Sequence, residues 1–345
     1  MSTASSTAQI PAGPGARPER ARTRSGTADD NRAQLILALV ACIVLATCLG
    51  MAVFVLLKAL PSFTGNGLGW FGTADTDRQL EVIFKSPANP DAYVYEIGAG
   101  PLILGTILTS LGAVTLGLIF STFTAIFIVE FAPDWIRKVL EPTVRLLAAV
   151  PSVVYGLIGI LVLVPFVANS LVSDGRRESV SYVVQLTGAC WTVAALVLAV
   201  MVVPIMVAII VDALHAVPRS WTEGAAALGV NRWRVMWTIS VRTARPAIIA
   251  SVILATGRAI GEAIMIAMVS GSASFVPQPV DGITFFFEPV RTLASAIVDN
   301  AEGLSVIPFG QTIYAFAFIL LISSAFLSWA GAVAKRPLRK YGINS

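Results

Sequence analysis

Residues 187–211 read TGACWTVAALVLAVMVVPIMVAIIV, and this run of 25 residues contains no Asp, Glu, Lys or Arg. The hydrocarbon core of a bilayer takes about 20 apolar residues in a helix, so the run is long enough to cross it. The whole chain has the same character, because 56% of its 345 residues are hydrophobic and only 13% are charged. An average soluble domain has about 25% charged residues. The composition therefore predicts an integral membrane protein.

The sequence holds five further apolar runs that are long enough to cross a bilayer. We expect helices in all six runs, because a spanning helix satisfies its own backbone and no run alternates as barrel strands do. The fold class that follows is an all-α polytopic membrane protein with six transmembrane helices. The predicted spans are 35–57, 101–129, 146–168, 187–211, 247–270 and 309–333.

Lys and Arg are distributed unequally over the two sides that these spans define. The side of the N-terminus holds 17 of the 24 basic residues, the opposite side holds six, and Arg258 lies within a span. Basic residues accumulate in cytoplasmic loops, so we expect both termini in the cytoplasm. The predicted segments are a disordered tail at 1–33, a first helix with a long outer loop at 34–100, a transmembrane domain at 101–335 and a C-terminal tail at 336–345.

Several kinds of chemistry are not expected in this chain. The three cysteines, Cys42, Cys48 and Cys190, have no metal-ligand spacing. The single histidine, His215, leaves no catalytic triad or histidine cluster to propose, and we expect no special role for it. No GxxxxGK[ST] motif is present, so ATP binding by a P-loop is excluded. Membrane topology explains the basic excess, which does not indicate nucleic acid. We expect a non-enzymatic chain without metal or cofactor, surrounded by membrane lipid.

The longest loop on the predicted cytoplasmic side, at 212–246, has a helical pattern of its own. The run EGAAALG from Glu223 favours a short helix that ends at Gly229, a residue suited to the left-handed conformation after a helix. A second amphipathic helix is expected from NRWRVMWTI with Arg232, and Pro246 is expected to open the next span. The loop is therefore predicted to be a docking element. A generic basic loop at the membrane surface is the other interpretation.

This loop resembles the EAA motif of bacterial ABC importer permeases, in which E-A-A is followed by three residues, Gly, nine residues and I-x-L-P. The spacing from Glu through Gly to Ile is retained, although Gly224 replaces Ala, Val241 replaces Leu and Arg242 replaces Pro. The resemblance implies that the loop is the coupling helix, which sits in a cleft of the ATPase subunit. The residues expected to make this contact are Glu223, Gly224, Ala225, Gly229 and Arg232.

Three further segments are similar to the permeases of the phosphate-specific transport (Pst) system. They are 104–133, 148–160 with AAVPSVVYGLIGI, and 256–271 with TGRAIGEAIMIAMVSG. The long first outer loop is similar to that of the PstC type. The resemblance implies the MetI-like fold of a type I ABC importer permease in a bacterial cytoplasmic membrane. It also implies a PstA-type second permease, two copies of a PstB-type ATP-binding subunit and a PstS-type external phosphate-binding protein as partners.

The function that this resemblance implies is ATP-driven import of inorganic phosphate, with the chain forming half of the translocation path. Two alternatives stay open. A permease of the same fold can carry another oxyanion, such as phosphonate, sulfate or molybdate. An ion-coupled secondary transporter or channel that acts alone belongs to a different class, and the EAA-like loop argues against it.

Arg258 and Glu262 are the charged residues of the fifth predicted span. A charge at the bilayer centre costs about 3 kcal/mol on insertion scales. Residues i and i+4 share a helix face, and a position in the middle of the span makes snorkelling difficult. In one interpretation both residues belong to the substrate path. Arg258 offsets the desolvation of a phosphate, since a guanidinium presents a planar fork of donors, and Glu262 orients Arg258 or accepts a hydrogen bond from the protonated oxygen of HPO₄²⁻. The other interpretation is a buried salt bridge that locks the permease pair. By contrast, Glu130 is expected to be a solvated charge at a helix end, and pairing with basic residues of the loop at 212–246 is the other interpretation.

The segment PSVVYG at 151–156 is the second candidate for the path. Pro151 is expected to kink the third span by removing a backbone hydrogen bond, and Gly156 permits close packing. These two residues form the predicted hinge, while Ser152 and Tyr155 supply hydroxyl groups to the path. A kinked packing motif with satisfied hydroxyls is the other interpretation.

Overall fold

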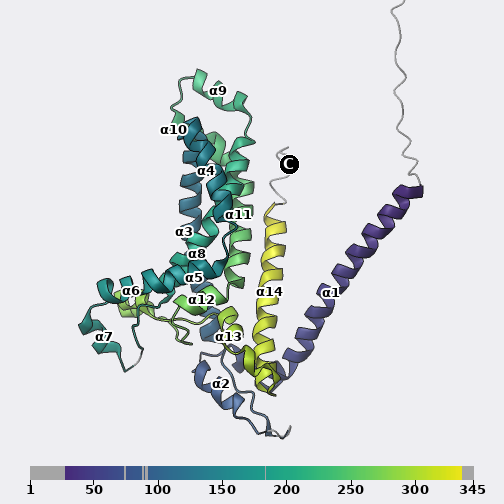
Figure 1. The fold of residues 1–345 in the computed structure, drawn as a ribbon, viewed down its shortest axis with the longest axis vertical. Helices are drawn as coiled ribbons and strands as arrows, with labels where there is room; N and C mark the ends of the chain where they lie inside the picture. The colour runs from purple at the N-terminus through teal and green to yellow at the C-terminus, as the bar shows by residue number, and fades with distance from the viewer. Residues whose placement is uncertain (1–27, 74, 88, 90–91, 183, 336–345) are drawn as a thin grey trace, which may run out of the picture. The chain divides into compact units, whose positions relative to one another are not determined.

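The computed structural model describes residues 28–73, 75–87, 89, 92–182 and 184–335 (Figure 1). Regular structure in these residues is helical, apart from one isolated bridge between Gly271 and Val290. Six of the described helices are long and apolar enough to cross a membrane, which confirms the all-α polytopic fold and the number of spans. They cover Arg32–Phe71, Gly100–Phe131, Ser152–Leu171, Trp191–His215, Arg232–Gly261 and Phe309–Val333.

The first helix, α1, runs from Ala28 to Asn66. The chain divides between Met51 and Ala52 into two compact units, and the described part of the first unit is the beginning of α1. Apolar side chains there are exposed, as suits a helix that faces lipid. The predicted tail at 1–33 is wrong for residues 28–33, which are helical. The rest of that tail, and the one predicted at 336–345, lie outside the described residues.

Three helices of the second unit, α3 (Gly100–Ile126), α8 (Trp191–His215) and α11 (Val241–Gly261), lie side by side (Figure 1). α8 is the most buried of the six spans, because 67% of its apolar window is inside the protein. It is apolar on all sides, as a buried helix is. Small residues allow the close approach: a Cβ added at Gly117 of α3 would lie 3.1 Å from the Val202 side chain of α8.

The second span ends in a π turn, η3 (Phe127–Phe131), which leads into the amphipathic helix α4 (Asp134–Leu147). A helix end leaves carbonyl groups without partners. Arg137 of α4 satisfies two of them, because its Nε and Nη2 donate to the carbonyls of Ile128 and Val129 at 3.0 and 2.7 Å. The over-long apolar run at 101–129 is thus terminated by a side chain that folds back on it.

The third span ends in the same way. The π turn η5 (Val167–Leu171) leads into α7 (Asp174–Val180), with the same spacing between turn and Asp as in η3 and α4. Arg177, three residues after that Asp, donates from Nη2 to the carbonyl of Ala168 at 2.7 Å. Arg137 likewise follows its Asp by three residues. Because the two spans are consecutive, this cap is repeated at opposite ends of the bundle.

The third span begins later than predicted. Residues 146 and 147 end α4, a turn follows, and α5 (Ser152–Ile158) begins directly after Pro151. The span continues through the π turn η4 (Gly159–Leu163) and α6 (Val164–Phe166) into η5. Pro151 occupies the N-cap position with φ −58°, so the expected kink inside the span is wrong. A proline before the first turn removes no helical hydrogen bond, which explains its place there.

The fifth span begins earlier and ends earlier than predicted. After α9 (Arg219–Ala227), α10 (Arg232–Val235), the π turn η6 (Met236–Ser240) and α11 follow one another without interruption. Pro246 lies inside α11 and opens no new helix. The helix ends at Gly261, and a separate short helix, α12 (Ile264–Val269), follows. The predicted span at 247–270 therefore consists of two helices.

The loops predicted to lie outside are built largely of short helices at the end of the bundle opposite α9 (Figure 1). We call these two ends the α2 end and the α9 end. The α2 end contains η1 (Gly67–Phe71), α2 (Thr76–Phe84), η7 (Pro279–Phe287), α13 (Leu293–Asp299), η8 (Ala301–Ser305) and the start of α14 (Phe309–Lys335). Its core includes the fully buried side chains of Trp70, Ile83 and Phe316.

Candidate substrate path

The predicted charged pair lies at the break between α11 and α12. Arg258 is in the last turn of α11, and Glu262 has extended backbone angles, φ −74° and ψ 117°. The Nε of Arg258 lies 3.7 Å from Oε1 of Glu262. The expectation that Arg258 lies in mid-span is therefore wrong, because the helix ends three residues after it. The i,i+4 spacing still brings the two charges together at the end of α11.

The guanidinium of Arg258 retains hydrogen-bonding capacity. Its side chain is 36% exposed, and that of Glu262 is 15% exposed. The Nε is buried and has no hydrogen-bond partner among the described residues, since 3.7 Å is too long for such a bond. A buried donor without an acceptor is unfavourable by about 1–3 kcal/mol. The site is therefore suited to an oxyanion, which supplies acceptors.

The segment 151–156 packs against α12, directly beside this break. A Cβ added at Gly156 would lie 3.2 Å from Cα of Met265 and 3.1 Å from Sδ of Met268. One turn further along, a Cβ at Gly159 would lie 2.7 Å from the Val269 side chain. These two glycines let α5 and α12 approach closely. The hinge role of Pro151 and Gly156 stays a prediction.

The hydroxyl of Tyr155 donates to the carbonyl of Leu147 at 3.0 Å. This bond spans the turn at Pro151 and joins the start of the third span to the end of α4. Ser152 is the first residue of α5 and is half-buried. A path role for the hydroxyls of Ser152 and Tyr155 stays a prediction.

The predicted docking loop is exposed at the α9 end. No residue of α9 is buried, and Glu223 and Gly224 are exposed while Ala225 is half-buried. Gly229 has φ +77°, so the predicted left-handed glycine after the helix is confirmed. Its amide donates to the carbonyl of Ala226 at 2.9 Å. An ATPase contact at these residues stays a prediction.

Arg232 fixes the loop to the end of the second span. Its Nε lies 3.7 Å from Oε2 of Glu130, and its guanidinium carbon lies 5.2 Å from the centre of the Phe131 ring. Trp233 continues the contact with a ring-centre distance of 6.2 Å to Phe131. The expectation that Glu130 is a solvated charge is wrong. Both it and Arg232 contribute to the position of the loop.

α4 and the end of α8 are joined by one ion pair and by a contact between a histidine and a carboxylate. Arg145 lies 3.0 Å from Asp212, and His215 Nε2 lies 3.8 Å from Oε1 of Glu141. His215, for which we expected no special role, thus lies within ion-pairing distance of a carboxylate. The hydrophobic cluster at this end includes Leu214 and, packed against it, Leu140.

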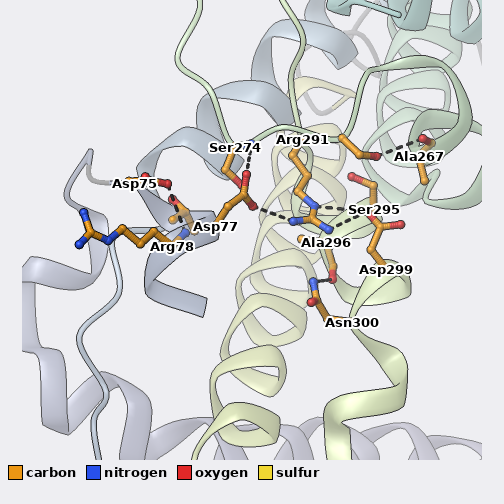
Figure 2. A network of polar contacts seen from close by, with 12 residues as sticks. Asp75, Asp77, Arg78, Ala267, Ser274, Arg291, Ser295, Ala296, Asp299 and Asn300 are labelled. Atoms are coloured by element: carbon orange, nitrogen blue, oxygen red, sulfur yellow. Dashed lines mark hydrogen bonds and ion pairs between the residues drawn. The ribbon is translucent and has the colours of Figure 1, made fainter. Parts of the chain in front are cut away.

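Sequence reasoning missed a polar network at the α2 end (Figure 2). Arg291 donates from Nη1 to Asp77 at 2.7 Å and from Nη2 to Asp299 at 2.8 Å. Asp77 also accepts from the amide and the hydroxyl of Ser274 at 2.8 and 2.7 Å. Arg291 is only 13% exposed. The network joins α2, α13 and the segment after α12.

Glu288 is a second polar residue that sequence reasoning missed. It is 2% exposed, and its Oε2 accepts from the amide of Gln278 at 3.1 Å, which closes the segment that contains η7. Burial, with a contribution from nearby Asp281, raises the pKa of Glu288 to about 7. The same segment contacts the start of α8, where the indole of Trp191 donates to the carbonyl of Phe285 at 2.6 Å.

Comparison with known proteins places this arrangement in a family. The model of the family described as binding-protein-dependent transport system inner membrane component matches residues 117–339. The chain belongs to this family. The match includes the break at Gly261, the segment 151–156 and the loop at α9. It begins within α3, so α1 and α2 lie outside it.

Three relatives of this family member show its type. The probable ABC transporter permease protein YqgH of Bacillus subtilis is 32% identical over 312 residues, which cover 87% of this chain and 91% of the relative. The phosphate transport system permease protein PstC of Pasteurella multocida is 30% identical over 70% of this chain and 75% of its own. The phosphate transport system permease protein PstC 1 of Mycobacterium tuberculosis is 33% identical over 72% of this chain and 74% of the relative. The chain is thus a multi-pass ABC transporter permease of the PstC type, as predicted.

Proposed function

We propose that this permease imports inorganic phosphate and forms half of the translocation path of an ATP-driven importer. The observation that carries the proposal is the guanidinium of Arg258, which lies at a helix break with a buried Nε that no described acceptor satisfies. The PstC relatives support phosphate as the anion. A guanidinium binds the oxygens of phosphate through parallel N–H donors.

Glu262 gives the site its selectivity in this proposal. Its carboxylate lies 3.7 Å from Arg258 Nε, so it competes with an anion for the guanidinium. Monohydrogen phosphate carries a proton that a carboxylate accepts, whereas sulfate carries none. Arg258 therefore pairs with Glu262 when no anion is present and shares its donors with phosphate in transit. Ser152 and Tyr155 add hydroxyl donors along the same path.

The α9 end is the cytoplasmic end in this proposal, and both termini are cytoplasmic. Its basic residues, including Arg232 and Arg145, follow the rule for cytoplasmic loops. A PstB-type ATPase subunit, present in two copies, contacts Glu223, Gly224, Ala225 and Gly229 and hydrolyses the ATP, so this chain is not itself an enzyme. A PstA-type permease supplies the other half of the path in the bacterial cytoplasmic membrane. A PstS-type protein delivers phosphate at the α2 end.

Uptake of labelled phosphate by cells that express the complete system tests the proposal. Unlabelled arsenate is expected to compete and sulfate is not, since only arsenate shares the protonation and shape of phosphate. Arg258→Gln is expected to lower the rate per assembled complex about 10- to 100-fold, the effect of removing a charged hydrogen-bond partner. Arg78→Gln is the matched control, because Arg78 is an exposed arginine at the α2 end. Equal competition by sulfate, or normal uptake by Arg258→Gln, would contradict the proposal.

A permease for another oxyanion is the second candidate, because the fork of Arg258 suits any tetrahedral anion. Sulfate, molybdate or phosphonate then competes better than arsenate in the same assay. A secondary transporter that acts alone would move the anion without the ATPase subunit. Uptake by the purified chain in vesicles without partners would identify that class.

A further inference from the structure

We infer that Arg291 is a positioning residue of the proposed substrate path, because it holds the α2 end of α12 while the other end of α12 adjoins Glu262. The inference deepens the proposed function and rests on it for the meaning of the path. It concerns α2 as well, since Asp77 of that helix completes the network (Figure 2).

The backbone of Arg291 is fixed to α3. Its carbonyl packs so closely on Gly105 that an added Cβ there would lie 2.4 Å from the oxygen. Two residues later, the amide of Leu293 donates to Oγ1 of Thr106 at 3.0 Å. Arg291 thus extends from a backbone that the main bundle holds in place.

The side chain of Arg291 reaches two carboxylates from that position. Nη1 lies 2.7 Å from Asp77, while Nη2 and Nε lie 2.8 and 3.2 Å from one oxygen of Asp299. The Asp77 side chain is 41% exposed and that of Asp299 is 24% exposed. The arginine is the least exposed member, so loss of either carboxylate leaves a largely buried charge with fewer partners.

Asp77 connects Arg291 to the segment that follows α12. It accepts two hydrogen bonds from Ser274, as described above. Two more bonds fix the chain between Ser274 and α12. The hydroxyl of Ser272 donates to the carbonyl of Ala267 at 3.1 Å, and the amide of Val290 donates to the carbonyl of Ser270 at 2.9 Å. The residue next to Val290 is Arg291 itself.

α12 is short enough to transmit the position of this segment. Its six residues span about 9 Å at 1.5 Å per residue. One end is the segment held by Arg291, and the other end follows Glu262 by two residues. Between them the helix rests on Gly156 and Gly159 without free space. A displacement at the α2 end therefore moves Glu262 relative to Arg258 and α5.

Amide hydrogen exchange of the assembled transporter in lipid nanodiscs tests the inference. Asp77→Asn and Arg291→Gln are expected to speed exchange in residues 264–274 about fivefold, the effect of losing a partly screened ion pair. Exchange in α8 serves as the internal reference and is expected to stay unchanged. Asp75→Asn is the matched control, because it removes a neighbouring carboxylate, which accepts a hydrogen bond from the amide of Arg78 at 3.2 Å. Arg291→Lys, which keeps the charge, is expected to restore most of the protection.

Phosphate uptake per assembled complex is the second readout. The maximal rate is expected to fall in Asp77→Asn and Arg291→Gln, with half-saturation by the loaded binding protein unchanged. A merely structural role would instead raise exchange in α8 and α12 together and lower the amount of complex. That result would overturn the inference, as would unchanged exchange at 264–274. If the wild type imports no phosphate, the proposed function fails, while the exchange comparison still decides whether Arg291 holds α12.

Discussion

Gly105 offers a sharp test of the packing between α3 and the Arg291 segment. In Gly105→Ala, the new Cβ would lie 2.4 Å from the Arg291 carbonyl oxygen and 3.2 Å from its carbonyl carbon. Ordinary van der Waals contact begins at 3.4 Å, so the new Cβ and the Arg291 carbonyl oxygen must move apart by about 1 Å. Overpacking of this kind destabilises by about 1–3 kcal/mol. The carbonyl belongs to the backbone and cannot rotate away as a side chain does.

The assay is the thermal unfolding temperature of the purified transporter. Gly257→Ala is the matched control, because Gly257 also lies inside a spanning helix and its Cβ would meet only Leu327 at 3.7 Å. Any gain in helix propensity is shared by the two variants and cancels in the comparison. Gly105→Ala is expected to unfold at least about 2 °C below Gly257→Ala. Equal unfolding temperatures would refute the reasoning.

Three further predictions concern other parts of the molecule. Gly224→Ala, which restores the alanine of the EAA motif in open space, is expected to stabilise α9 by up to about 1 kcal/mol and to preserve phosphate-driven ATPase activity, measured on the complex. Arg137→Met is expected to destabilise the α9 end by about 1–3 kcal/mol in thermal unfolding, since it leaves two carbonyls unpaired, whereas exposed Lys138→Met has little effect. The raised pKa of Glu288 means that the folded state binds this proton more tightly than the unfolded state does. The contribution of Glu288 to stability is therefore complete below about pH 4.5 and is lost as the pH rises through about 7. Glu288→Gln is expected to flatten this part of the profile of unfolding temperature between pH 4.5 and 8.

The spans were predictable because length and composition decide them. A charge-free run such as 187–211 has no stable place outside a bilayer or a deep core, and its helix is the most buried span. Gly229 was predictable for a local reason as well, since its positive φ suits glycine at the end of a helix. These features depend on residues close together in the sequence.

The break at Gly261 was not predictable, since no proline marks it. The run from Ile260 to Val269 is apolar apart from Glu262 and is typical of one continuous helix. After the break, α12 packs on Gly156 and Gly159, a contact between segments that are far apart in the sequence. Pro246 was expected to open a helix, but it lies inside α11. A spanning helix tolerates a proline when neighbouring groups satisfy the backbone carbonyl that the proline leaves free.

The network of Arg291 was hidden for a similar reason. Arg291 and Asp77 are 214 residues apart, and each was one charge among others in a long loop. Neither periodicity nor a motif connects them. Arg258 and Glu262 were found from the sequence because charges are rare in apolar runs. Their position at the end of a helix was not predicted.

The continuity of the fifth span has a mechanical consequence. Arg232, beside the docking loop, and Arg258 belong to one uninterrupted stretch of helix, and 26 residues separate them. At 1.5 Å per residue this is a lever about 39 Å long, so a tilt of about 5° at one end displaces the other by about 3 Å. That displacement is close to the 3.7 Å that separates Arg258 from Glu262. Since Glu262 adjoins a helix held from the opposite end, we expect a small rotation at the predicted docking loop to change the distance between the two charges.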